Sequence, residues 1–494
     1  MADTAVAEKP APPKDSSSWF DRFFEISARG STVTREIRGG LATFFTMAYI
    51  VVLNPLILAA GADKNGTHLS ITQVAAATAL VAGVMTILMG VVGRFPLALA
   101  AGLGVNAIVA YEIAPRMTWA DAMGLVVIEG VIITVLVLTG LRTAVFNSVP
   151  AGLKTAIAAG IGLFLVLIGL VDSGIVRRVP DAAGTTVPVG LGINGRLIGW
   201  PTLVFVLGLV LTLILLVRKV KGAILIGIIT ATVFAIVVET VAKIGPSFIS
   251  PSERNPVGWS LNVPAVPKGD QIVDTPDLGL LGKFNVLGSW ETAGWLVALM
   301  FAFTLLLTDF FDTMGTMVAV GQEGGLLDEN GQPPRTREIL LVDSLAAAAG
   351  GAASVSSNTS YIESAAGVGE GARTGAANLV TGGLFLVAMF ISPLVAVVPF
   401  EAASAALVVV GFLMMTSIRF IDWTDYEIAI PAFLTMVLMP FTYSISNGIG
   451  AGIISYVVLK AVRGRFRDVH PLLYGVAVLF LLYFLRGELE RLLF

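Results

Sequence analysis

Apolar residues occur along this chain in long runs that short polar or glycine-rich segments separate. Most runs between residues 41 and 463 are close to the ~20 residues that a helix needs to cross a bilayer. The pattern predicts fourteen membrane spans, at 41–60, 71–92, 95–112, 121–140, 151–171, 198–217, 222–242, 291–312, 338–354, 358–372, 376–398, 401–416, 427–445 and 446–463. A last apolar run, 470–484, is too short to span comfortably and is expected in the interface or against the bundle, so the location of the C-terminus stays open.

The spans divide into two equal sets around one long polar stretch. A tail (1–38) precedes a first seven-span repeat (39–243), and a loop (244–290) connects it to a second repeat (291–463) and a C-terminal segment (464–494). An odd number of crossings in each repeat forces the second copy to run upside down relative to the first. Such inverted repeats are typical of secondary transporters.

Composition supports an all-α, polytopic membrane protein. Mean hydropathy is +0.87, and charged residues make up 13% of the chain, about half of the ~25% usual in soluble domains. The net charge of −3 gives no sign of nucleic-acid binding. There is no cysteine, and the two histidines, His68 and His470, are too few for a histidine cluster. With no HExxH site and no glycine-rich phosphate loop, we expect no enzyme, no bound metal and no cofactor.

Basic residues predict the orientation, because Lys and Arg favour cytoplasmic loops. With the N-terminus in the cytoplasm, the predicted inner loops contain Arg94, Arg142, Arg218, Lys219, Lys221, Arg335, Arg337, Arg373, Arg419, Arg463, Arg465 and Arg467. Arg177, Arg178 and Arg196 in predicted outer loops count against this orientation. We expect a multi-pass protein of the cell membrane with a cytoplasmic N-terminus and an extracellular 244–290 loop.

Two predicted spans, the third and the tenth, are interrupted in corresponding places. The third contains Gly102, Gly104 and Asn106, and the tenth is a run of Ser, Gly and Ala around Glu363. Unwound backbone is tolerated in a bilayer only where it lines a cavity or is buried in protein, and paired interruptions mark transporter binding sites. The alternative is that the small residues only allow close helix packing.

Three carboxylates at membrane depth are candidate functional groups, because each costs several kcal/mol unless it faces water or a partner. Asp309 and Asp312 lie three residues apart in the eighth span, and Glu363 lies in the tenth. A carboxylate can accept paired N–H donors from a planar heterocycle, and a second can carry a coupling proton. The alternative is that Asp309 caps a helix end and Asp312 faces the cytoplasm.

Other acids in the spans have more ordinary explanations. Glu129 and Glu239 are either proton sites or partners in structural hydrogen bonds between helices. Asp343 is expected at the N-cap or in the first turn of the ninth span, where an acid is favoured.

Several motifs resemble one known family. They are 308–316 (TDFFDTMGT), 322–328 (QEGGLLD), 361–368 (YIESAAGV), 40–55 (GLATFFTMAYIVVLNP) and 102–107 (GLGVNA). These motifs are similar to those of the AzgA-like adenine/guanine/hypoxanthine permeases, in the nucleobase–cation symporter 2 (xanthine/uracil permease) family. The resemblance extends from about residue 38 to 463.

The resemblance implies a core domain of spans 1–4 and 8–11, a gate domain of spans 5–7 and 12–14, short strands in spans 3 and 10, and a homodimer formed through the gate domain. It also implies roles for the candidate residues. Asp309 and Glu363 would contact the base, Asn106, Gly104, Tyr361 and Ile362 would complete the substrate site, and Asp312, Asp309 and Glu363 would serve proton coupling.

The function that these observations favour is import of adenine, guanine or hypoxanthine by proton symport with alternating access. One departure from the family pattern bears on the substrate, because Ser364-Ala365-Ala366-Gly367 replaces the Asn-x-Gly of the uracil and xanthine branches. The alternatives are a uracil/xanthine permease and an anion transporter of the sulfate-permease kind, which shares the seven-plus-seven arrangement. Acids at the broken spans would repel an anion.

Overall fold

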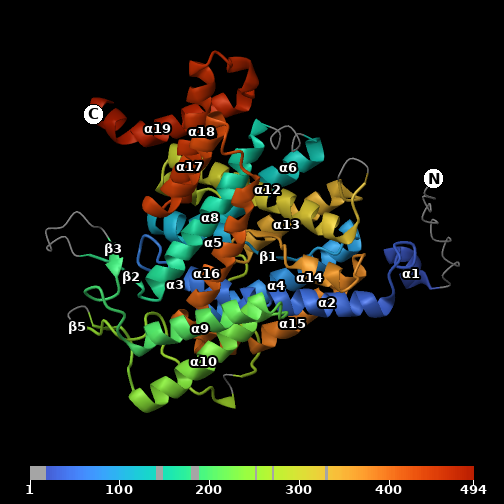
Figure 1. Cartoon of the computed structure of the whole chain (residues 1–494), viewed down its shortest axis with the longest axis vertical. Helices are drawn as coiled ribbons and strands as arrows, with labels where there is room; N and C mark the ends of the chain where they lie inside the picture. The colour runs from blue at the N-terminus through green and yellow to red at the C-terminus, as the bar shows by residue number, and fades with distance from the viewer. Residues whose placement is uncertain are drawn as a thin grey trace, which may run out of the picture.

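The structure is a computed structural model that describes residues 18–140, 148–179, 189–250, 253–269, 272–328 and 332–493. The described part of the chain is predominantly helical (Figure 1). In the described part of the chain, ten helices are long and apolar enough to cross a membrane. They are Val33–Ala60 (α2, Val33–Met47, and α3, Ile50–Ala60), Ile71–Gly93 (α4, Ile71–Leu88, with one further turn), Trp119–Thr139 (α6), Ala151–Asp172 (α8), Trp200–Val217 (α9), Ala223–Ala242 (α10), Trp295–Gly324 (α12), Ala376–Val397 (α15, Ala376–Ala388, with an extension), Phe400–Phe420 (α16, Phe400–Met415, with an extension) and Ile445–Val462 (α18).

The remaining predicted spans are shorter or interrupted. The ninth corresponds to α13 (Thr336–Ala352) and the thirteenth to α17 (Tyr426–Phe441), while the third and tenth contain only short elements. A count of fourteen crossings therefore stays a prediction. The last apolar run forms α19 (Pro471–Leu493), which packs against α12 and α18.

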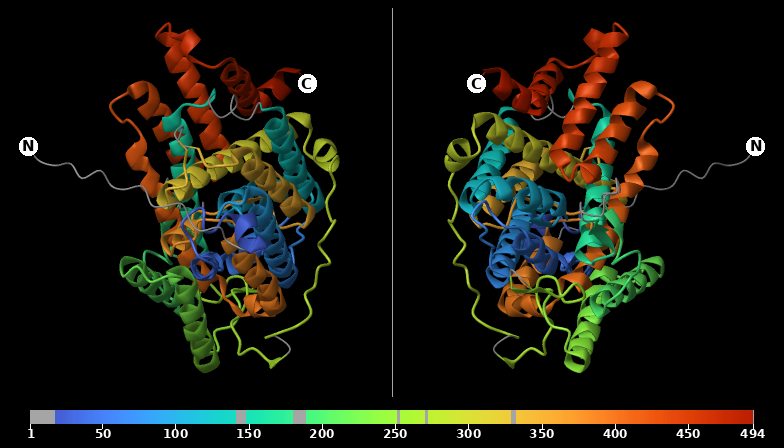
Figure 2. Two further views of the ribbon diagram at one scale, coloured as in Figure 1. Left: turned by 90° about the vertical axis from the view of Figure 1, so that its right-hand side faces the viewer. Right: turned by 90° about the vertical axis from the view of Figure 1, so that its left-hand side faces the viewer.

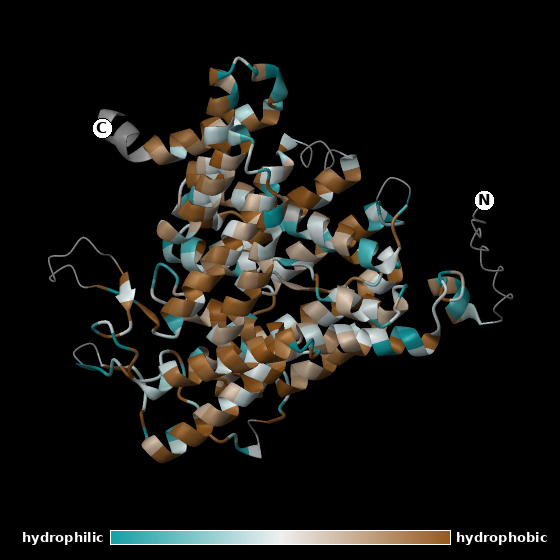
Figure 3. Ribbon diagram, in the orientation of Figure 1, coloured by the Kyte–Doolittle hydropathy of each residue, from teal (hydrophilic) through white to brown (hydrophobic). Residues whose placement is uncertain are grey.

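Apolar residues dominate the described helices (brown in Figure 3), and many of them have side chains exposed on the outside of the bundle. Helices α9 and α10, for example, expose Leu207, Val210, Ile229 and Val233. Water would disfavour such a surface, whereas the apolar lipid tails accept it. A helix also satisfies its own backbone hydrogen bonds, as the interior of a bilayer requires. The exposed apolar residues thus fit a membrane-embedded bundle.

The helices pack in two groups. Helices α8, α9, α10, α16, α17 and α18 pack mainly on one another, and we call them the gate group. Helices α2, α3, α4, α6, α12, α13 and α15 form the second set, the core group. Figure 2 shows blue helices from the start of the chain beside gold and orange ones from its second half, in agreement with the packing of α15 on α2 and α4. Both halves of the chain therefore contribute to each group.

Two short strands meet near the middle of the molecule (Figure 1). Strands β1 (Leu99–Ala101) and β6 (Asn358–Ser360) pair antiparallel, with Leu99 opposite Ser360. A six-residue helix follows each strand, α5 (Leu103–Ile108) after β1 and α14 (Ser364–Gly369) after β6. Both strands and both short helices pack mainly on helices of the core group, and we count them in that group. Extended backbone at this depth needs partners, and the two interrupted segments supply them to each other.

The largest difference from the sequence prediction is the length of α12. The eighth span was predicted to end at 312, but α12 continues to Gly324. Asp309 and Asp312 therefore lie inside the helix, and neither caps a helix end. The expectation for Asp343 was also wrong, since α13 begins at Thr336 and Asp343 lies about two turns further along, at 3.6 residues per turn, not at the N-cap or in the first turn.

The loop after α10 runs along one side of the molecule (Figure 2). It contains β4 (Phe248–Ser250), β5 (Glu253–Arg254) and α11 (Gly288–Thr292). A hairpin of β2 (Val176–Arg178) and β3 (Val189–Leu191) follows α8, and α1 (Trp19–Phe24) precedes α2. Residues 1–17 of the predicted tail lie outside the described ranges.

Candidate functional site

A cavity of about 80 Å³ lies where β6 and the start of α5 meet α12 and α16. From the core group it is lined by Tyr49, Gly102, Leu103, Gly104, Asp312, Thr316, Ser360, Tyr361, Ile362 and Glu363, and from the gate group by Val410 and Met414. The cavity thus lies between the two helix groups. A site in this position changes shape when one group moves against the other.

Glu363 lies three residues after the end of β6, at the N-cap position of α14. Its Oε1 accepts a short hydrogen bond from the Tyr49 hydroxyl. Tyr49 is only 1% exposed, so packing fixes its ring and hence the direction of this bond. The second oxygen of Glu363 remains able to accept a hydrogen bond from a ligand.

Tyr49 was not among the residues predicted from sequence. It belongs to the 40–55 motif, but nothing in the sequence connects it with a carboxylate 314 positions away. A tyrosine inside an otherwise apolar span is the signal that could have found it, because a buried hydroxyl needs a hydrogen-bond partner.

We expect Tyr49→Phe to weaken ligand binding about five- to tenfold without unfolding the protein. The substitution removes one hydroxyl, so Glu363 loses the donor that orients it, at a cost of about 1–1.5 kcal/mol for one hydrogen bond. Equilibrium binding on purified protein measures the effect. Tyr361→Phe is the wrong control, because Tyr361 also lines the cavity, whereas Tyr474→Phe alters a hydroxyl that bonds only to the Phe466 carbonyl. Equal affinities for Tyr49→Phe and Tyr474→Phe would contradict the orienting role.

Asp312 points from α12 into the same cavity, with Thr316 one turn further along the helix. The Asp312 side chain is exposed to this space. None of the described residues that line the cavity is a lysine, arginine or histidine. The cavity therefore offers two carboxylates without a facing cation, which suits a ligand rich in N–H donors and opposes an anion.

The strand pair and its flanking turns shape the floor of the cavity. The Tyr361 hydroxyl donates to the Ala101 carbonyl at 2.6 Å, and the Tyr361 amide donates to Ala98 O at 2.9 Å. Gly104 approaches α8 so closely that a Cβ there would lie 2.7 Å from Ile161 Cγ2. A larger residue at this position would force the Ile161 side chain to move where the core group contacts the gate group.

The structure brings Glu363, Asp312, Tyr361, Ile362 and Gly104 together around one cavity. Asp309 and Asn106 are fully buried but do not line it. Both amide atoms of Asn106 lack a hydrogen-bond partner in the described part of the chain. Their predicted contact with substrate stays a prediction.

Asp309 faces a polar layer behind the cavity. Its carboxyl group lies near that of Glu129 in α6, and the Ser357 hydroxyl also lies near Glu129. Asp343 accepts hydrogen bonds of 2.8 Å from the hydroxyls of Thr313 and Ser360. Since Ser360 also lines the cavity, Asp343 connects to the site by direct hydrogen bonding.

Glu239 has a purely structural environment. Its carboxylate accepts from the Trp259 indole N–H at 2.8 Å and from the backbone N–H of Ile244 at 3.0 Å. These bonds join the end of α10 to the long loop. The contacts of Glu239 are thus structural, but they are made with the loop and not, as the structural alternative stated, with a neighbouring helix.

The chemistry available at the cavity is recognition by hydrogen bonding. Over the described residues there is no group of three or more His, Asp or Glu side chains placed to hold a metal ion. The lining combines carboxylates, hydroxyls, backbone and a few apolar groups. Such a lining can bind a flat, uncharged molecule by its edges and faces.

Comparison with known proteins gives three findings. Residues 34–451 match the Permease family (Xan_ur_permease). The chain is 38% identical over 470 residues to the guanine/hypoxanthine permease PbuG of Bacillus subtilis, covering 94% of this chain and 99% of that protein. It is 35% identical to the adenine permease AdeQ of Escherichia coli, covering 94% and 96%. Both proteins are named as permeases, that is, as membrane transporters and not enzymes.

Among solved structures, the chain is similar to the transmembrane domain of a cyanobacterial bicarbonate transporter, BicA. The TM-score is 0.58 at 13% identity, covering 85% of this chain and 97% of that one. At this identity the likeness concerns the fold alone. An anion transporter therefore shares the architecture, whereas the sequence relatives are nucleobase permeases.

Proposed function

Because this chain belongs to the Permease family, we propose that it imports purine nucleobases by proton symport with alternating access. The observation that carries the proposal is the acidic cavity between the two helix groups, with Glu363 and Asp312 in its lining. A purine is flat and uncharged and presents N–H donors at its edges. A carboxylate oriented by Tyr49 can accept those donors.

We propose adenine, guanine and hypoxanthine as the substrate class. The two relatives described above match nearly the whole chain and are named as permeases of these bases. The segment after Glu363 is Ser364-Ala365-Ala366-Gly367 instead of Asn-x-Gly, which disfavours uracil and xanthine. An anion such as bicarbonate is disfavoured, because the described lining contains two carboxylates and no basic residue.

Equilibrium binding to purified protein tests the substrate class. We expect saturable binding of at least one of adenine, guanine and hypoxanthine, and much weaker binding of uracil and xanthine. Binding of bicarbonate or sulfate in competition with labelled purine would contradict the proposal, because an anion would then share the acidic cavity.

We propose protons as the coupling ions, carried by the cavity carboxylates. A transmembrane potential supplies ~2.3 kcal/mol per elementary charge per 100 mV, enough for uphill uptake.

We further propose that the protein lies in the cell membrane with its N-terminus in the cytoplasm, as a homodimer formed through the gate group.

Alternating access requires contacts between the groups that form and break, and Glu112 makes one. It follows α5 in the core group and is 7% exposed. Its carboxylate accepts hydrogen bonds from Ser444 Oγ at 2.9 Å and Ser446 Oγ at 3.0 Å, and a short one from the Ile445 backbone N–H. These donors surround the N-terminus of α18 in the gate group, where the helix dipole also favours a negative charge. In the proposed orientation this contact lies on the extracellular side and holds it closed.

We expect Glu112→Gln to open the extracellular side more often. Glutamine keeps one acceptor but loses the charge, and each bond to a charged group contributes roughly 1.5–3 kcal/mol. The outward-open population should rise about tenfold or more. Since the chain has no cysteine, Ile161→Cys reports opening, because Ile161 is 3% exposed in α8 beside Gly104.

The measurement is the rate at which the cysteine of the Ile161→Cys protein reacts with a membrane-impermeant maleimide added outside. Glu239→Gln is the matched control. The hydrogen bonds described above join Glu239 to the long loop after α10, and none of them joins the two helix groups. Equal rates in the Glu112→Gln and Glu239→Gln proteins would show that Glu112 does not hold the groups together.

A further inference from the structure

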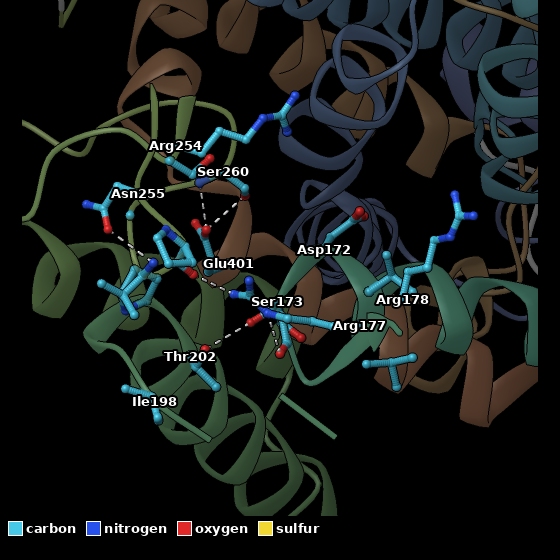
Figure 4. Close-up of a pocket in the computed structure, with 18 residues that line it drawn as sticks. Asp172, Ser173, Arg177, Arg178, Ile198, Thr202, Arg254, Asn255, Ser260 and Glu401 are labelled. Carbon is cyan, nitrogen blue, oxygen red and sulfur yellow. Dashed lines mark hydrogen bonds between the residues drawn. The ribbon is translucent and has the colours of Figure 1, made fainter. Parts of the chain in front are cut away.

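A second cavity, of about 440 Å³, lies apart from the transport site (Figure 4). It is formed by the end of α8, strand β2, the start of α9, residues of the long loop and the start of α16. All of these helices belong to the gate group. We call this space the outer cavity, because the proposed orientation places it on the extracellular side.

Two carboxylates in the outer cavity have acceptor atoms without donors. Glu401 is 2% exposed, and its Oε1 accepts from the Ser260 backbone N–H at 2.9 Å and the Ser260 hydroxyl at 2.8 Å. Its Oε2 is buried and has no hydrogen-bond partner in the described ranges, and the same holds for Oδ2 of Asp172. Figure 4 shows both carboxyl groups among the lining residues.

Buried acceptors without donors are costly, so each needs an explanation such as an ordered water, an ion or a ligand. Asp172 and Glu401 are close enough to repel each other electrostatically. A ligand that donates hydrogen bonds to both would satisfy the two oxygens and separate the charges with its own polar edges.

The basic residues restrict the charge of that ligand. Three arginines and two acids line the outer cavity. Arg177 donates to the carbonyls of Gly174 at 3.3 Å and Pro256 at 2.8 Å, which holds its guanidinium group in place. Arg178 and Arg254 are exposed at the rim. A cation would meet these arginines at the entrance, so an uncharged molecule with N–H donors fits better.

The walls and the size favour a small flat ring. Val171, Ile198, Pro201 and Val257 provide apolar surface between the polar groups. The volume lies within the roughly 300–1,000 Å³ typical of small-molecule sites. Purines carry N–H donors on both of their fused rings, so one purine can reach carboxylates on two sides.

We propose that the outer cavity is a second binding site for a purine nucleobase, with Glu401 and Asp172 as its acceptors. The inference rests on the proposed function for the choice of ligand class. Glu401 lies in the first turn of α16, and the same helix lines the transport cavity with Val410 and Met414. Val410 lies nine positions after Glu401 in this helix, about 13.5 Å along the axis at 1.5 Å per residue. A purine bound outside therefore contacts the helix that also forms the transport site.

A cysteine at the outer cavity tests the proposal without relying on transport. Ser247 lines the cavity and is partly exposed, and the chain has no native cysteine. In the full-length Ser247→Cys protein, we expect adenine, guanine or hypoxanthine to slow maleimide labelling at least threefold at saturation. The protection should persist in the Glu363→Gln background, where the transport site is impaired, and should disappear with Glu401→Gln, because an amide N–H then faces the ligand's donors.

Thr275→Cys is the control, since Thr275 is exposed in the same loop but does not line the cavity. Purine should not protect it. Unchanged labelling of the Ser247→Cys protein at every purine concentration would overturn the proposal, and so would protection by Na⁺ or Ca²⁺ alone, which would make the cavity a cation site. A third outcome separates the two proposals. If purine protects the Ser247→Cys protein but no purine binding depends on Glu363, the outer site is supported and the proposed function is contradicted.

Discussion

Replacing Glu363 with glutamine is expected to weaken purine binding about ten- to a hundredfold. Tyr49 donates to one oxygen of the carboxylate and leaves the other available to the ligand. The amide offers one acceptor where the carboxylate offers two, and it loses the charge. A hydrogen bond to a charged group contributes roughly 1.5–3 kcal/mol, which corresponds to this range of affinities.

The effect is measured by equilibrium binding on purified Glu363→Gln protein. Glu291→Gln serves as a charge-matched control, because Glu291 is exposed in α11 and lines neither cavity. The melting temperatures of both variants should equal that of the parent protein. Unchanged affinity in a folded Glu363→Gln protein would remove Glu363 from the site.

Asp312→Asn is expected to abolish gradient-driven accumulation while leaving purine exchange intact. Asp312 and Glu363 line the same small cavity, and none of the described residues that line it is basic. Two like charges so placed repel each other, and a proton on one of them relieves the repulsion. A permanently neutral asparagine mimics the protonated state, so the cycle can run as exchange but cannot respond to a pH gradient.

Counterflow and gradient-driven uptake, measured in the same vesicles, separate these two activities. The prediction requires that Asp312→Asn keeps counterflow near the parent rate and loses accumulation against a gradient. If the variant still concentrates purine, Asp312 is not required for coupling, and the role would pass to Glu363 or Asp309.

Much of the site could be predicted because short motifs carry it. Gly104, Tyr361, Ile362 and Glu363 lie in interrupted spans, and such interruptions persist in a bilayer only where they line a cavity or find partners. The sequence could not place Asp309 relative to Asp312. A separation of three residues leaves the two side chains about 60° apart around the helix axis, and only the rotation of α12 decides which one faces the cavity.

The sequence alone also could not predict which side chains contact the candidate site residues. Tyr49 reaches Glu363 across 314 residues, and Asp309 meets Glu129 on α6. Such contacts follow from how the two halves of the chain interleave. The end of α12 was misplaced for a related reason. The predicted eighth span ends at 312, close to where the apolar run gives way to Asp309 and Asp312. Buried acids with polar neighbours can lie inside a helix, and α12 continues to Gly324.

The most direct test of proton-coupled purine import is uptake by proteoliposomes under an imposed pH gradient. With the acidic side outside, the parent protein is expected to accumulate labelled adenine, guanine or hypoxanthine above the external concentration. A protonophore should reduce the internal level to equilibrium. Uptake that never exceeds equilibrium, or accumulation that the protonophore does not affect, would contradict proton symport, and transport of bicarbonate or sulfate in place of purine would contradict the substrate class.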